Sequence, residues 1–163
     1  MTHQEQFITL LNKSLAENTF VKLLLANYKG TTEDLKKCLV KRILIKQEDK
    51  LSFTYRYQTK DIVKNFSIDE AIKFIKEFLE SGDFRHAALL TLESDVIFEL
   101  LSHGKTTFKK NKPTHQELPS LEHNIQKNRL LTTQGKVYLK QLKIIDDRGI
   151  VIPSSQDKFK QIN

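Results

Sequence analysis

Two neighbouring segments in residues 38–58 restrict this chain to folds that contain an antiparallel β-sheet. Residues 51–58 alternate large apolar with polar side chains, and the apolar positions are Leu51, Phe53, Tyr55 and Tyr57. A period of two is typical of a β-strand with one face in a core. Residues 38–46 are rich in β-branched and aliphatic side chains, and the polar residues 47–50 predict a turn. We therefore expect a β-hairpin over these residues.

The segments around this hairpin predict two helices and one more strand. Apolar residues at helical spacing predict a helix at about residues 4–16. Ser67 and Glu70 form a capping box at the start of a second helix, which Gly82 is expected to end. The apolar segment 20–28 is short and predicts a strand, although residues 23–26 would also suit a buried helical turn.

The remaining apolar runs complete the predicted fold class. Residues 87–91, 96–101 and 105–110 are separated by short polar stretches, which predicts three further strands. The sequence thus predicts an α+β fold, with a mainly antiparallel sheet of about five to six strands packed with helices. A helical C-terminal tail is expected to follow this sheet.

The polar residues 112–119 divide the predicted body from the predicted tail. We expect residues 1–112 to form the α+β body. Residues 113–155 are expected to form a tail that packs on the body as one domain, with helices at about 120–131 and 134–142 and a small hairpin at 144–152. Residues 156–163 predict the start of a further helix, interpreted as a linker.

Several function classes lack their motifs in this sequence. The five glycines are isolated from one another, whereas a phosphate-binding loop needs clustered glycines. There is no HExxH motif, no pair of CxxC motifs and no G-x-S-x-G motif. We therefore expect no metal, no cofactor and no catalytic residue in this chain.

Composition predicts a cytoplasmic location. Cys38 is the single cysteine, so it has no internal disulfide partner, and a reducing compartment is the default for such a chain. The N-terminal residues lack the basic and apolar regions of a signal peptide. No window contains the about 18 consecutive apolar residues of a membrane span, and we expect no membrane partner.

Positive charge is concentrated in two segments of the chain. The formal net charge is +7. Residues 36–64 hold nine Lys or Arg against three acids, and residues 103–129 hold six against two, whereas residues 65–102 hold three against eight. This segregation favours an anionic partner such as RNA. The candidate binding residues are Arg56, Lys60, Lys64, Lys109, Lys110, Lys112, His123, Lys127 and Arg129.

Each part of this candidate set has a competing structural interpretation. Basic residues at a strand end are often only solvated, and lysines on an edge strand discourage pairing with other chains. Tyr55 and Tyr57 could stack on bases, but alternation places them on the opposite strand face from Arg56. His123 and Lys127 are four residues apart and share one face of a helix, where they could bind an oxyanion or lie exposed.

Five segments taken together resemble a known family. They are LSFTYRYQTKDIVKN (51–65), GDFRHAALLTLESD (82–95), NKPT (111–114), HNIQKNRLL (123–131) and YLKQLKIIDDRGIVIPSSQDKFKQIN (138–163). In this order they resemble the N-terminal region of a bacterial family of predicted class I S-adenosylmethionine-dependent methyltransferases. The resemblance spans about residues 20–163. It adds Asn65 to the candidate binding residues.

The resemblance implies an accessory, substrate-recognition domain. In that family the region is followed by a Rossmann-like methyltransferase domain that carries the glycine-rich cofactor loop. By this resemblance S-adenosylmethionine belongs to the following domain, which would be a partner of this chain, and RNA is the expected substrate. The family more often has an acid and a base after the histidine, where this chain has Asn124 and Ile125.

Two other function classes remain open from the sequence. One is a protein-interaction module without nucleic-acid binding, which an exposed apolar patch beside the basic residues would favour. The other is a winged-helix-like DNA reader formed by the tail, which ranks last because the spacing of its short helices is generic.

Overall fold

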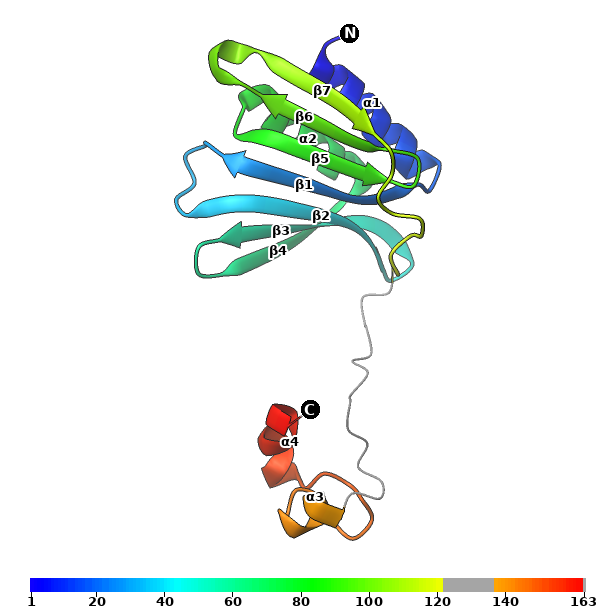
Figure 1. Cartoon of the computed structure of the whole chain (residues 1–163), viewed down its shortest axis with the longest axis vertical. Coiled ribbons are helices and arrows are strands. Elements are labelled where there is room, and N and C mark those ends of the chain that lie inside the picture. Colours follow the sequence, from blue (N-terminus) through cyan, green and yellow to red (C-terminus); the bar gives the residue numbers. More distant parts are fainter. Residues whose placement is uncertain (122–136, 163) are drawn as a thin grey trace. The chain divides into compact units, whose positions relative to one another are not determined.

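The structure is a computed structural model that describes residues 1–121 and 137–162. It divides into two compact units, Met1–His123 and Asn124–Asn163, and each is described here by itself. The first unit is an antiparallel sheet with two helices (Figure 1). Its elements are α1 (His3–Ala16), β1 (Phe20–Tyr28), β2 (Leu35–Ile45), β3 (Glu48–Tyr57), β4 (Asp61–Ser67), α2 (Ile68–Ser81), β5 (Phe84–Thr91), β6 (Asp95–Leu100), the short η1 (Ser102–Gly104) and β7 (Thr106–Asn111).

The predicted α+β class is confirmed, and the sheet is larger than expected. It has seven strands in the order β4-β3-β2-β1-β5-β6-β7, rather than five to six. All neighbouring strands are antiparallel. Strands β1 to β4 form one meander and β5 to β7 a second. Helix α2 connects β4 at one edge to β5, and the two meanders meet where β1 pairs with β5.

The strand that the sequence prediction missed is β4. It lies at the sheet edge, where only Ile62 and Phe66 are partly buried on the core side. Its other residues are exposed, so polar side chains hide the period of two. The hairpin prediction is also refined: Lys46 and Gln47 form the turn, with φ of 49° and 66°, in place of residues 47–50. Positive φ at both positions matches the right-handed twist of the flanking strands.

Both long helices begin with a capping box. In α2 the Ser67 side chain accepts from the Glu70 backbone N–H, and the Glu70 carboxylate accepts from the Ser67 N–H, as predicted. Gly82 ends α2 in the left-handed region with φ of 74°, also as predicted. An equivalent box of Thr2 and Glu5 starts α1.

The core lies between the helices and one face of the sheet. Both helices lie behind the sheet in Figure 1, on the same side. We call this side of the sheet the helix face. Its fully buried side chains include Phe7 and Leu11 of α1, Ile75 of α2, and Phe53 and Phe98 of the sheet. Alternation along each strand places the intervening residues on the opposite side, which we call the open face.

The second unit is small. It contains α3 (Val137–Gln141), η2 (Pro153–Ser155) and α4 (Gln156–Ile162), with Leu139, Ile144 and Ile145 buried together. The predicted hairpin at 144–152 is one antiparallel bridge between Ile145 and Val151. The described part of the helix predicted at 134–142 is α3, which ends at Gln141, and residues 134–136 lie outside the described residues. Helix α4 starts at the expected residue. Residues 122–131 of the other tail helix lie outside the described residues, and packing of the tail on the body stays a prediction.

Candidate functional site

The open face carries one continuous row of side chains across the whole sheet. The strand register aligns one residue of each strand, because directly paired residues share a face. In sheet order these residues are Val63, Thr54, Leu39, Leu24, Ala88, Ile97 and Lys109. We call this set the central row. Five of its seven members are apolar.

The central row is accessible from solvent. Val63 is 57% exposed, and Leu24, Leu39, Ala88 and Ile97 are half-buried. Within residues 1–121, both α-helices pack on the helix face, so no α-helix of this unit covers the row. The solvated face of an antiparallel sheet usually carries polar side chains, so an apolar row on this face departs from that pattern.

Basic side chains border the central row on β1, β2 and β3. On β2, Lys37 and Lys41 lie two residues to either side of Leu39, and both are exposed. On β3, Arg56 pairs with Lys37 across the strands and forms an ion pair with Asp61 of β4 at 3.7 Å. Lys22 of β1 lies two residues from Leu24 on the same face. This half of the open face therefore carries a net positive charge.

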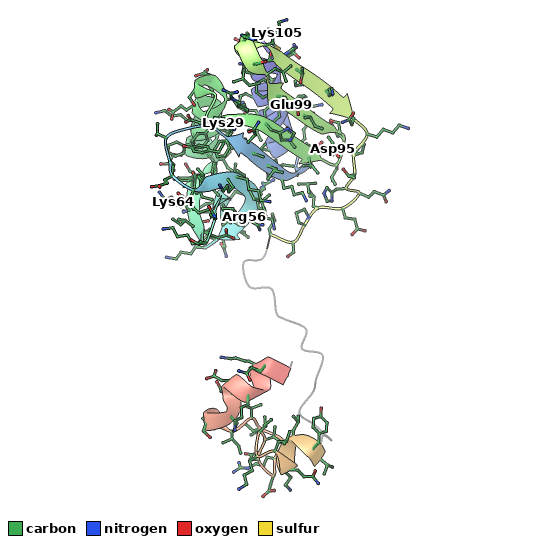
Figure 2. All side chains as sticks on the ribbon, turned by 60° about the vertical axis from the view of Figure 1, so that its left-hand side comes forward. Lys29, Arg56, Lys64, Asp95, Glu99 and Lys105 are labelled. Carbon is green, nitrogen blue, oxygen red and sulfur yellow. The ribbon has the colours of Figure 1, made fainter. Side chains whose placement is uncertain are left out.

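Acidic side chains border the row at β6. Asp95 and Glu99 lie two residues to either side of Ile97. Figure 2 shows both on the sheet well away from Arg56. Glu99 Oε1 lies 3.2 Å from His86 Nδ1, and its Oε2 accepts from the Thr107 hydroxyl at 3.4 Å. Asp95 accepts from the backbone N–H of Thr114 at 3.2 Å and from its hydroxyl.

Residues 112–121, which follow β7, contact β6 near their start and β2 at their end. The contact of Thr114 with Asp95 fixes the start of this segment, and the Leu121 carbonyl accepts from the Leu44 N–H of β2 at 3.2 Å. Figure 1 shows the segment passing the ends of the central strands. These contacts join residues 112–121 to the first unit.

The structure separates the residues that the sequence grouped into one basic site. Arg56, Asn65 and Lys109 lie on the open face, whereas Lys64 and Lys110 pair with Phe53 and Val96 and therefore lie on the helix face. The other members lie elsewhere. Lys60 lies in the β3–β4 turn with its Nζ 5.6 Å from the Tyr57 ring centre, Lys112 follows β7, and His123, Lys127 and Arg129 lie outside the described residues.

The tyrosines next to Arg56 do not reach the open face. Tyr55 and Tyr57 both pack against the helix-face core, and burial raises the pKa of the Tyr55 phenol above its ordinary value. The same holds for the other rings of residues 1–121. Each Phe or Tyr is in the helix-face core or contacts a ring that is: Phe7, Phe20, Phe53, Phe66, Phe74, Phe78, Phe84, Phe98, Phe108, Tyr28, Tyr55 and Tyr57.

Sequence reasoning missed the apolar members of the central row. A signal for them was present: the runs Leu23–Leu25, Cys38–Val40, Ala87–Leu90 and Val96–Phe98 are apolar without alternation. A strand that is apolar at every position has apolar residues on both faces. Only the strand register, however, brings Leu24, Leu39, Ala88 and Ile97 into one line.

Other site types receive little support from the described residues. Residues 1–121 and 137–162 contain no group of three His, Cys, Asp or Glu side chains that could hold a metal ion. Among the helices of the same residues, none has the length and apolar character needed to cross a membrane. A groove of about 490 Å³ lies between α1 and α2, and its walls combine polar and charged side chains such as Glu5 and Lys76 with the apolar Ile8 and Leu79.

Comparison of the chain with protein-family models, with curated proteins and with solved structures gives no match. The resemblance to the methyltransferase family therefore stays a prediction from the sequence segments alone.

Proposed function

We propose that the first unit is a protein-binding module that holds an acidic segment of a partner protein on its open face. The central row carries this proposal. It offers apolar contact area, and Lys22, Lys37 and Lys41 supply positive charge beside it. Apolar centres with charged borders are the usual anatomy of protein interfaces.

The composition of the open face favours a protein over RNA. Proteins that bind single-stranded RNA on a sheet stack the bases on exposed aromatic rings. In residues 1–121 the rings lie in or against the helix-face core, and the open face presents aliphatic side chains instead. Aliphatic side chains bury well against other apolar side chains but offer no stacking plane. RNA is therefore the competing partner in the test below.

The charge of residues 130–163 differs from the charge expected of the bound segment. Residues 130–163 hold six Lys or Arg against three acids, so they do not complement a positively charged surface. We propose a segment from another domain or another protein. In the accessory role that the resemblance predicts, this partner is the methyltransferase domain, which would itself hold S-adenosylmethionine.

The proposal is tested by charge reversal on the two faces of the same sheet. The K37E/K41E variant changes two exposed lysines of the open face, and K64E/K110E changes two exposed lysines of the helix face. Both variants alter the net charge equally. The probe is a fluorescent peptide of about 16 residues that contains leucine and glutamate, with oligouridine as the nucleic-acid probe.

We expect the peptide to bind the wild-type chain and K64E/K110E with equal affinity. Its affinity for K37E/K41E should be about tenfold lower, because each exposed ion pair that is lost contributes about 0.2–1 kcal/mol and the new glutamates repel the acidic peptide. Fluorescence polarisation measures both probes. Equal peptide binding by the two variants contradicts the proposal. Binding of oligouridine alone, weakened by K37E/K41E, would assign the surface to RNA.

A further inference from the structure

We infer that the partner segment is an amphipathic α-helix that lies across the strands along the central row, with its acidic end over β2. This inference rests on the proposed function and specifies the conformation and direction of the bound segment. It follows from the spacing of the row, the charges at its two ends and the state of the sheet edges.

The spacing of the central row matches one face of a helix. Leu39, Leu24, Ala88 and Ile97 lie on four adjacent strands, β2, β1, β5 and β6. Strands are spaced by about 4.8 Å, so the row from Leu39 to Ile97 extends about 14 Å. A helix repeats its apolar face about every 5.4 Å, so about 10 residues cover the same length. Apolar residues at positions i, i+3 or i+4, and i+7 then meet successive strands.

The charges beside the row give the helix a direction. On β2, Lys37 and Lys41 lie to either side of Leu39, and on β6, Asp95 and Glu99 lie to either side of Ile97. Residues two apart on a strand are separated by about 7 Å, which is slightly more than the radius of about 5–6 Å of a helix with its side chains. Both flanks of a helix on this row therefore face lysines at the β2 end and carboxylates at the β6 end.

An extended segment is a poorer match than a helix. A sheet face offers no free backbone hydrogen-bonding groups, so an extended segment across the row would bury unpaired N–H and C=O groups. A helix satisfies its own backbone groups. Pairing at a sheet edge is discouraged as well, because the edge strands β4 and β7 carry exposed lysines at Lys64, Lys109 and Lys110.

Selection from a library of random 16-residue peptides displayed on phage tests the inference with the full chain. Peptides are selected on the wild-type chain and counted again on K37E/K41E and on K64E/K110E, which serves as the matched control. A peptide is specific for the open face when its recovery on K37E/K41E is at least tenfold lower than on the wild-type chain and its recovery on K64E/K110E is unchanged.

We expect these specific peptides to carry apolar residues at helical spacing, with acids gathered toward one end. A synthetic peptide of this group should bind at least tenfold more weakly when a central residue is replaced by proline. Specific peptides with period-two alternation, or binding that proline leaves unchanged, would overturn the helix and leave the protein-binding function intact. A selection that yields no peptide sensitive to K37E/K41E would overturn both.

Discussion

The thiol of Cys38 reports whether β2 has the register that creates the open face. Cys38 lies between Leu25 of β1 and Tyr55 of β3 and is fully buried. Burial raises the pKa of its thiol to about 12. Because an ordinary thiol has a pKa of about 8.5 and only the thiolate reacts, the lower thiolate fraction alone slows alkylation at pH 8 by about 10³-fold.

The neighbouring position supplies the matched control. Leu39 is half-buried on the open face, so cysteine in an L39C/C38A variant should react within about tenfold of a free peptide thiol. Iodoacetamide labelling at pH 8, followed by mass spectrometry, measures both rates, and circular dichroism confirms that both chains are folded. A shift of one residue in the register exchanges the two faces of a strand. Rapid labelling of Cys38 with protection of position 39 would therefore refute the central row.

Three further predictions concern stability, measured by urea unfolding. G82A should cost about 1–2 kcal/mol, because a side chain at φ of 74° is strained and its Cβ would lie 2.9 Å from Leu100 Cδ2; an unchanged midpoint would contradict this. S67A should cost about 1 kcal/mol by removing the α2 cap, and a loss below about 0.3 kcal/mol would count against the capping box. Hydrogen bonds from Arg42 lower the pKa of Asp49, so the wild-type advantage over D49N, about 0.5 kcal/mol, should be present above pH 4 and lost as the pH falls through the folded pKa. An advantage that persists at pH 2 would contradict that assignment.

Local patterns in the sequence correctly predict strand β3 and helix α2. The alternation in residues 51–58 correctly places Leu51 and Phe53 in the core, because one strand face packs on the helices. The boundaries of α2 follow from the Ser67–Glu70 capping box and Gly82. The sequence did not predict β4, because an edge strand buries few side chains and therefore shows little apolar alternation.

The candidate site depends on information that a single sequence does not carry. Lys109 and Lys110 are adjacent in the chain, yet they lie on opposite faces of the sheet, as do Arg56 and Lys64. A count of charge along the chain does not show on which face of the sheet each charge lies. That assignment needs the strand boundaries and the register, and register is a property of pairs of segments that are distant in sequence.

The complete open face forms only when the two meanders pair through β1 and β5. Pairing of Ala26 with His86 closes a loop of about 60 residues, at an entropic cost of about 3.6 kcal/mol plus a constant. Each meander alone holds only part of the central row: Leu24 and Leu39 belong to one, Ala88 and Ile97 to the other. A partner that spans the row as proposed would bind the fully folded chain and neither meander alone, and such binding would shift the folding equilibrium toward the joined sheet.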